Sequence, residues 1–250
     1  MTDFSPDSKF ATRVVPSPNH DARAAPIDMI VLHYTGMTDA DAALARLCDP
    51  AAKVSSHYLV NDDGAVTQLV PEAQRAWHAG VSSWHGVTDI NSCSIGIEID
   101  NPGHEFGYPD FPAAQIDAVI ALCRDIIARH AIPAARVLAH SDVAPGRKND
   151  PGEKFPWPAL AAAGVGLWVE PSRIVPGPEL DPGDRGEVIS KVQTMLKEFG
   201  YALDVTGTFD TAMADVVTAF QRHFRPARVD GIADHSTTET LKRLLALMRR

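Results

Sequence analysis

Cysteine is scarce in this chain. Cys48, Cys93 and Cys123 are the only three in 250 residues, too few and too scattered for a disulfide framework. No two of them have the close spacing of a zinc-finger pair, so histidine and carboxylate are left as ligands for any metal site. Cys123 falls on the apolar stripe of a helix expected at about 112–130, which predicts that it belongs to the core.

Long apolar runs and an excess of basic charge are also missing. No uninterrupted apolar segment approaches the roughly 18 residues of a membrane span. The formal net charge of -9 argues against a nucleic-acid partner, because phosphate binding needs a basic face. Residues 1–9 lack the apolar core of a secretory signal. We therefore expect a cytoplasmic protein, with the periplasm as the alternative if the chain is a processed form.

The apolar residues that are present predict a mixed α/β fold. At 45% hydrophobic over 250 residues, the chain is long enough for one substantial domain and a smaller one. The hydrophobic pattern alternates between strand and helix signals along the first part of the chain. Strands are expected near residues 27–33, 57–62, 65–70, 94–100 and 136–140, and helices near 39–48 and 112–130.

The most informative segment is residues 139–152. His140 follows an apolar stretch, so it is expected at the end of a strand, and a loop with two prolines and two glycines can return Asp150 to its side. An imidazole and a carboxylate on a rigid turn form part of a zinc site that keeps a position for water. The alternative is an exposed histidine near a capping aspartate.

Two other predicted strands carry suitable groups. The run at 27–32 is typical of a strand buried on both faces, and His33 at its mouth is a candidate third ligand. The alternative is that His33 is a strand-terminal histidine that hydrogen-bonds to a neighbouring carbonyl. In the run at 94–100, isoleucines share one face and Glu98 lies on the other. Since a buried carboxylate needs a partner, Glu98 is a candidate acid/base, unless that face meets solvent.

Several motifs in register carry a family resemblance: I-V-L-H-Y-T at 30–35, S-S-H-Y-L-V at 55–60, W-H-A-G at 77–80, N-S-C-S-I-G-I-E-I at 91–99 and H-S-D-V-A-P-G-R-K-N-D-P-G at 140–152. Over roughly residues 12–162 the chain resembles the zinc-dependent N-acetylmuramoyl-L-alanine amidases of the AmpD/AmiD type. The resemblance implies a central mixed β-sheet flanked by helices. It also implies one Zn²⁺ held by His33, His140 and Asp150, with Glu98 and Lys148 as catalytic helpers.

Each implied role has a chemical reason. Zinc with three protein ligands keeps an open position and lowers the pKa of a bound water to about 7. Glu98 would take a proton from that water and pass it to the departing amine. Lys148 would place positive charge near the developing oxyanion; it is otherwise a solvated surface lysine. Arg147, Tyr58 and His78 are weaker candidates for substrate contact, with packing as the alternative for Tyr58 and His78.

The sequence changes character after residue 162. Glycines and prolines concentrate in residues 163–181, which is typical of a semi-rigid linker, and we expect Trp168 within it to dock on one of the domains. Residues 182–250 show three helical segments. The first is expected to place Val188, Val192, Met195 and Leu196 on one face. In the last, Ser236 and Glu239 have the spacing of a capping box.

This small three-helix segment resembles the peptidoglycan-binding domain appended to many cell-wall hydrolases. The alternative is a generic bundle used for dimerisation. The expected organisation is therefore a catalytic domain at 1–162, a linker at 163–181 and a peptidoglycan-binding-like domain at 182–250. A tethered wall-binding module would raise the effective concentration of the hydrolase at its polymer.

Together, the resemblances imply hydrolysis of the amide between N-acetylmuramic acid, or its anhydro form, and L-alanine of the stem peptide. Such a reaction serves cell-wall turnover or recycling, with peptidoglycan or soluble muropeptides as partners. The residues alone support only metal-assisted amide hydrolysis. One alternative is a non-catalytic peptidoglycan-recognition protein, although binding alone needs none of the ligand and helper residues. Another is a metallopeptidase that cleaves within the stem peptide.

Overall fold

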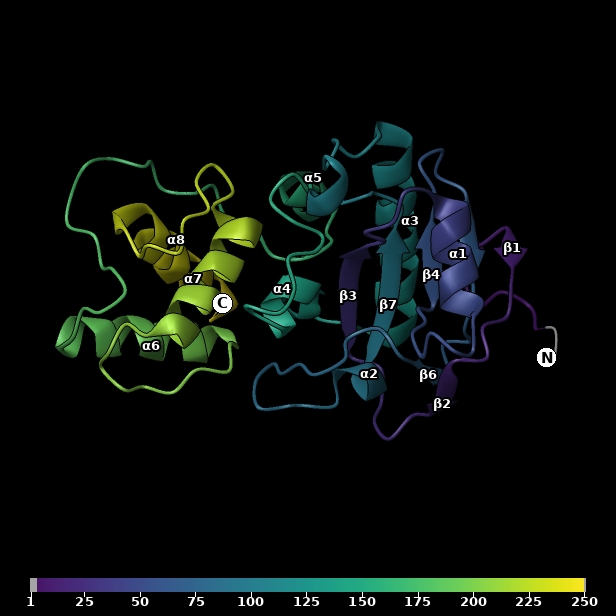
Figure 1. Cartoon of the computed structure of the whole chain (residues 1–250), viewed down its shortest axis with the longest axis horizontal. Coiled ribbons are helices and arrows are strands. Elements are labelled where there is room, and N and C mark those ends of the chain that lie inside the picture. The colour runs from purple at the N-terminus through teal and green to yellow at the C-terminus, as the bar shows by residue number, and fades with distance from the viewer. Residues whose placement is uncertain (1–3, 250) are drawn as a thin grey trace.

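A central mixed sheet organises the N-terminal part of the chain, as Figure 1 shows for the computed structural model, which describes residues 4–249. The strand order is β1-β5-β4-β7-β3-β8. Neighbouring strands are parallel, except for the antiparallel pair β4 and β5. The strands are β1 (Arg13–Val14), β3 (Met29–Tyr34), β4 (Tyr58–Val60), β5 (Val66–Gln68), β7 (Ser94–Ile99) and β8 (Val137–Ala139). Residues 1–3, part of the N-terminal segment interpreted above, and residue 250 lie outside the described residues.

The expected α/β fold class is confirmed. Each of the predicted strands and helices of this part is present, with α1 at Ala40–Cys48 and α3 at Ala113–His130. Short elements were not predicted from the sequence, because a turn or less of helix or a two-residue ladder leaves little periodic signal. They are β1, β2 (His20–Ala22), β6 (Gln74–Ala76), α2 (Ile90–Cys93), α4 (His140–Val143), α5 (Trp157–Ala162) and the 3₁₀ turns η1 (His104–Phe106) and η2 (Ala134–Arg136).

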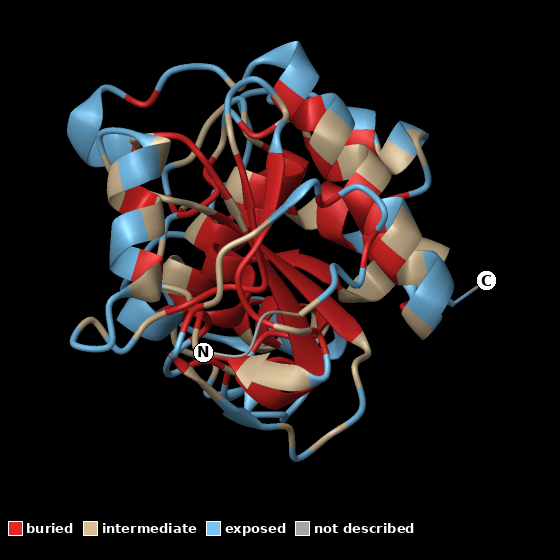
Figure 2. Cartoon of the chain, turned by 90° about the vertical axis from the view of Figure 1, so that its right-hand side faces the viewer, coloured by how far each residue is buried: buried red, intermediate tan, exposed pale blue. Residues whose placement is uncertain are grey.

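Side chains along β3 and β7 point alternately to the two faces of the sheet, which therefore differ in character. Ile30 and Leu32, with the isoleucines of β7, pack in one core cluster with α3, and Figure 2 shows these strands buried at the centre of the molecule. Side chains one residue on point to the opposite face. There His33 of β3 lies in register with Glu98 of β7. The sheet thus presents these two polar groups on the face away from α3.

Three helices form the C-terminal part: α6 (Glu187–Phe199), α7 (Thr211–Phe224) and α8 (His235–Met248). This bundle shares a hydrophobic core with the sheet domain, since Met29 and Leu138 belong to the same buried cluster as Leu196 and Phe220. Trp84 also packs edge-on against Tyr201, with ring centroids 5.0 Å apart. The bundle is therefore docked on the sheet domain.

Trp168 of the predicted linker is partly buried and packs against both core clusters. It was expected to dock on one domain, and it contacts apolar residues that hold the two together. In the part of the chain that the structure describes, no helix combines the length and apolar character required to cross a membrane. All three cysteines are free, and Cys123 lies on the buried face of α3, as its position on the apolar stripe predicts.

Two details expected of the bundle are wrong. Val192 and Leu196 are buried and Met195 packs against the core as expected, but Val188 is 59% exposed and Ile189, at 1%, takes its place on the buried face of α6. The capping box at Ser236 is also incorrect. Helix α8 is capped by Asp234, whose side chain accepts a hydrogen bond from the Thr237 N–H. Ser236 lies inside the helix, where its hydroxyl donates to the Ser172 carbonyl.

Candidate metal centre

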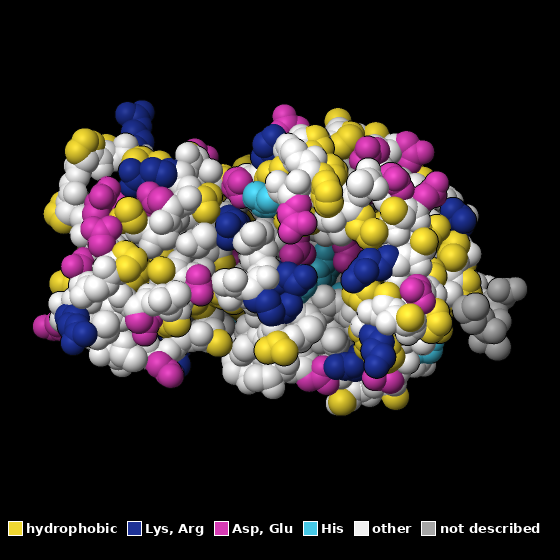
Figure 3. Space-filling view, viewed as in Figure 1, with side chains coloured by type: hydrophobic (Ala, Val, Ile, Leu, Met, Phe, Trp, Pro, Cys, Tyr) yellow, Lys and Arg dark blue, Asp and Glu magenta, His cyan; other side chains and the backbone are white. Residues whose placement is uncertain are grey.

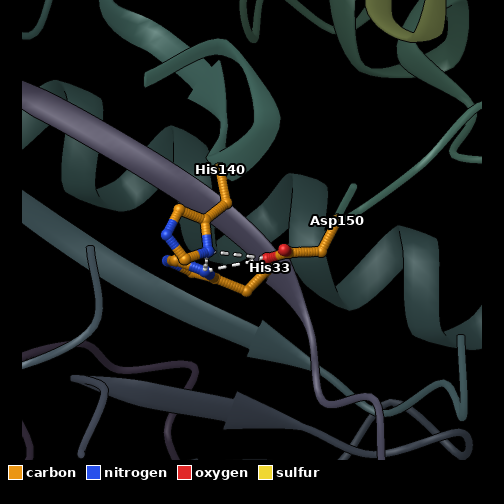
Figure 4. A group of neighbouring side chains, drawn as sticks. All are labelled: His33, His140 and Asp150. Atoms are coloured by element: carbon orange, nitrogen blue, oxygen red, sulfur yellow. Dashed lines mark hydrogen bonds and ion pairs between the residues drawn. The ribbon is translucent and has the colours of Figure 1, made fainter. Parts of the chain in front are cut away.

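Three buried side chains from separate segments converge on one point (Figure 4). His33 comes near the end of β3, and His140 directly follows β8. The loop after α4 returns Asp150 to the same place, where its carbonyl accepts a hydrogen bond from the Ser141 N–H. The structure thus brings together the three residues that the sequence put forward as ligands.

The facing atoms are one from each residue. His33 Nδ1 and His140 Nδ1 are 2.9 Å apart. Asp150 Oδ2 lies 3.1 Å from His33 Nδ1 and 2.9 Å from His140 Nδ1. Donor atoms around a tetrahedral zinc with bonds of about 2.0–2.1 Å are separated by about 3.3 Å. The group therefore needs to open by only a few tenths of an ångström to hold such an ion.

The hydrogen-bond network assigns the proton of the His140 ring. His140 Nε2 lies 3.0 Å from the Ala79 carbonyl oxygen. Because a carbonyl only accepts, Nε2 carries a proton, and in the tautomer that could bind a metal the lone pair is then on Nδ1. Nδ1 of His140 is the atom that faces His33 and Asp150.

The same reasoning applies to His33 through a short relay. Its Nε2 lies 3.0 Å from Nδ1 of His78, and His78 Nε2 lies 3.1 Å from the Ser94 hydroxyl oxygen. That hydroxyl donates to the Ile90 carbonyl at 2.6 Å, so it accepts from His78. His78 Nδ1 must then accept from His33 Nε2, which leaves His33 Nδ1 as a lone pair. With both rings in these tautomers, three lone-pair atoms would face one another, an arrangement that a bound cation stabilises.

The electrostatic surroundings keep these groups in the forms that bind metal. Burial, together with the neighbouring His140, lowers the pKa of His33 to about 4, so its ring is neutral near pH 7. For Asp150, burial opposes ionisation, but His140 and His33 outweigh it and hold the pKa of the carboxyl below its usual range. A neutral imidazole and an ionised carboxylate are the states required of metal ligands. The residues present therefore fit a zinc ion.

Glu98 lies beside this group without a partner of its own. It is in register with His33 on the adjacent strand, and its Oε2 is buried with no hydrogen-bond partner among the described residues. Burial, reinforced by the charge of Asp150, raises the pKa of Glu98 well above its ordinary value. Strongly perturbed acids in a cleft are typical of proton-transfer groups.

The metal-binding group opens into a cavity of about 390 Å³. Figure 3 shows histidine side chains at the bottom of this hollow, with charged side chains around it. Glu98, Lys148 and Arg147 all line the cavity. The Arg147 guanidinium also donates to the carbonyls of Ala79 and Val81, at 2.6 and 2.7 Å.

The remaining candidates are placed differently. Tyr58 is completely buried, outside the residues that line the cavity, and its hydroxyl donates to Glu72 at 2.6 Å. The structure does not bring it to the site. His104, which carries no signal in the sequence, lines the cavity, with its Nδ1 3.0 Å from the Tyr34 hydroxyl oxygen. His78 lies against His33, a candidate ligand, as described above.

Comparisons with known proteins show which proteins this chain is similar to. Residues 23–153 match the family described as N-acetylmuramoyl-L-alanine amidase, and residues 185–241 match a putative peptidoglycan binding domain. The N-acetylmuramoyl-L-alanine amidase AmiD of Escherichia coli strain K12 is 40% identical over 238 residues, covering 88% of this chain and 82% of that protein. The 1,6-anhydro-N-acetylmuramyl-L-alanine amidase AmpD of Salmonella typhimurium strain SL1344 is 36% identical over 171 residues, covering 60% of this chain and 88% of that protein.

A solved structure extends the likeness to the whole fold. The E. coli AmiD complex with the substrate anhydro-N-acetylmuramic acid-L-Ala-D-gamma-Glu-L-Lys has a TM-score of 0.75 and 38% identity, covering 91% of this chain and 92% of that one. The first matched segment contains every residue of the metal-binding group and also Glu98 and Lys148. The chain therefore belongs to the N-acetylmuramoyl-L-alanine amidase family of hydrolases.

Proposed function

We propose that this chain uses one zinc ion, held by His33, His140 and Asp150, to hydrolyse the amide between the muramic acid and L-alanine of muropeptides. The observation that carries the proposal is the convergence of three potential ligand atoms at 2.9–3.1 Å, beside a carboxyl with a buried, unpartnered oxygen and open to a cavity. A zinc ion there would lower the pKa of a bound water to about 7 and polarise the carbonyl of the amide.

Glu98 is proposed as the group that moves the proton. An amine is a poor leaving group until it is protonated, so the acid must first receive a proton and then deliver it to the departing nitrogen. The raised pKa of Glu98 makes its carboxylate a stronger base, which would let it take up that proton and hold it until the amine departs. Positioned proton transfer of this kind is typically worth about a hundred- to ten-thousandfold in rate.

Lys148 and Arg147 are proposed to act on the substrate from the loop that carries Asp150. Both line the cavity, and Lys148 precedes Asp150 by two residues. The ammonium of Lys148 would stabilise negative charge that develops on the carbonyl oxygen. Arg147 would bind a carboxylate of the stem peptide, since a guanidinium matches the geometry of a carboxylate.

The relatives support a muropeptide substrate. The E. coli AmiD structure is a complex with an anhydro-muramyl tripeptide, and the AmpD relative is named for the 1,6-anhydro form. We therefore propose that the anhydro-muropeptide is accepted here. We further propose that the C-terminal bundle binds peptidoglycan, because residues 185–241 match a putative peptidoglycan binding domain.

Product analysis tests this function. Purified sacculi and an anhydro-muropeptide are incubated with the protein, and the released fragments are identified by mass spectrometry. We expect stem peptides that begin with an intact L-alanine. A new amino terminus at a later stem residue would instead indicate a peptidase. Binding of both substrates without any cleavage would favour a recognition protein.

A further inference from the structure

Residues 77–80 lie on the Nε2 side of both histidines of the metal-binding group. We propose that His78 is a positioning residue for this centre: it fixes the orientation and proton placement of the His33 ring, while the adjacent Ala79 carbonyl does the same for His140. The inference rests on the proposed zinc site. It assigns to His78 a different role from the substrate contact expected from the sequence.

The relay that begins at His33 can run in only one direction. It passes from His33 Nε2 to His78 and on to Ser94, and it ends at the carbonyl of Ile90. Because that last group is a pure acceptor, every proton in the relay is directed toward it. His33 is thereby held with its proton on Nε2 and its lone pair on the metal side. Hydrogen bonds of this kind fix the orientation of a ligand ring and increase its basicity.

The backbone around His78 is itself held in place. The N–H groups of His78 and Ala79 both donate to Oδ1 of Asn91, at 3.1 and 2.8 Å. His78 is only 6% exposed. A single amide oxygen at the start of α2 thus anchors the two residues that contact the ligand rings.

The neighbouring strand leaves space for the His78 ring. A Cβ on Gly96 would lie 2.4 Å from Cγ of His78, far inside the contact distance of two carbon atoms. Gly96 stands between isoleucines in a strand, where a glycine weakens the strand and often marks a close approach. Here the close approach is that of His78, so the glycine and the histidine form one structural unit.

Both nitrogens of His78 are already used. Nδ1 accepts from His33, and Nε2 donates to Ser94. No polar atom of the ring is left for a substrate, although the side chain borders the cavity. Its polar contacts are therefore with the ligand ring and with the protein.

Substitution at residue 78 tests the proposal through zinc affinity, measured on the full chain by competition with a chromophoric chelator. His78→Leu removes both nitrogens, and we expect zinc to bind about ten- to a hundredfold more weakly. His78→Asn places an amide oxygen near the position of Nδ1, and we expect it to restore most of that loss. Leu122→Ala, a core change beneath the opposite face of the sheet, is the matched control and should leave the affinity unchanged.

Cobalt substitution gives a second readout, because its visible absorption reports ligand geometry. We expect an altered band for His78→Leu and a parent-like band for His78→Asn and Leu122→Ala. Equal zinc affinity in the parent and His78→Leu would overturn the inference and leave the metal site standing. A parent that binds no zinc would overturn the metal site as well. Should His78→Leu fail to fold, Gly96→Ala displaces the same ring, and parent-like affinity in that variant would also contradict the proposal.

Discussion

The hydroxyl of Tyr201, in the C-terminal part, donates a hydrogen bond of 2.7 Å to Asp142, which lies two residues after His140. The other oxygen of Asp142 lies 2.6 Å from Nδ1 of His223 and accepts from the Ala139 N–H at 2.9 Å. One buried carboxylate thus joins the helical bundle to the turn that presents His140. The bundle therefore contacts the sheet domain at the turn that carries His140.

Removal of the Tyr201 hydroxyl should weaken this junction. A hydrogen bond to a buried charged group contributes about 1.5–3 kcal/mol, so Tyr201→Phe should lower the free energy of unfolding by about that amount. Urea titration followed by circular dichroism measures the change. Tyr34→Phe is the control, since its hydroxyl bonds the exposed His104, and its loss should remain below about 1 kcal/mol. Equal losses in the two variants would contradict the special role of the Asp142 contact.

The shared core predicts that the two parts unfold together. Met29 and Leu138 of the sheet domain pack in one cluster with residues of α6 and α7, so unfolding of either part exposes apolar surface of the other to water. Fluorescence of Trp84 and Trp157, both almost completely buried, should follow the same urea transition as circular dichroism. Two separated transitions would mean that the bundle is a loosely tethered module, as its linker composition alone indicates.

Substitutions of the three candidate ligands and of Glu98 should affect different properties, zinc binding in the first case and turnover in the second. His33→Ala, His140→Ala and Asp150→Ala should each lose zinc, because three protein ligands are the minimum of a catalytic zinc site. Glu98→Ala should retain zinc and lose about a hundred- to ten-thousandfold in kcat. Metal analysis and steady-state kinetics on the same samples provide both values. Full zinc occupancy after Asp150→Ala would refute the ligand assignment.

Ionised Glu72 should contribute to the free energy of unfolding, and this contribution should be lost in acid. Burial alone would raise its pKa, but hydrogen bonds from Arg129, Tyr58 and His130 outweigh burial and lower the pKa to about 2. Since the folded pKa lies below the ordinary value of 4.5, the stabilisation is complete above about pH 4.5 and is lost as the pH falls toward 2.

We expect Glu72→Gln to cost about 3 kcal/mol near pH 7 and almost nothing near pH 2. Urea unfolding across this range measures the difference. The exposed Glu170→Gln should show little change at any pH. A difference between Glu72→Gln and the parent that does not vary with pH would contradict this account.

The meeting of His33 and His140 was predictable because both stand at strand ends, whereas the complete set of ligands and helper residues was implied by the family resemblance. The apolar run before His33 and the shorter apolar run before His140 indicate buried strands. Parallel strands place their carboxyl ends at one edge of a sheet. Alternation along β7 likewise put Glu98 opposite the isoleucine face. These are local patterns, and a single sequence contains them completely.

Other features depend on contacts between distant segments. The strand expected near residues 57–62 contains Tyr58, but only the packing of α3 and the position of Glu72 bury its hydroxyl. His104 reaches the cavity through loop geometry. The contact of Asp142 with Tyr201 joins residues 59 positions apart, in segments that the sequence assigns to separate domains. Nothing in the local sequence around either residue indicates their proximity.

The most direct test is the release of L-alanine-terminated stem peptide from an anhydro-muropeptide by the chelator-treated protein, before and after stoichiometric zinc is restored. Mass spectrometry identifies the product, and Asp150→Ala treated in the same way serves as the control. We expect no release without metal, full release once zinc returns to the parent, and none from the variant. Undiminished release by the metal-free parent would contradict a zinc-dependent amidase at His33, His140 and Asp150.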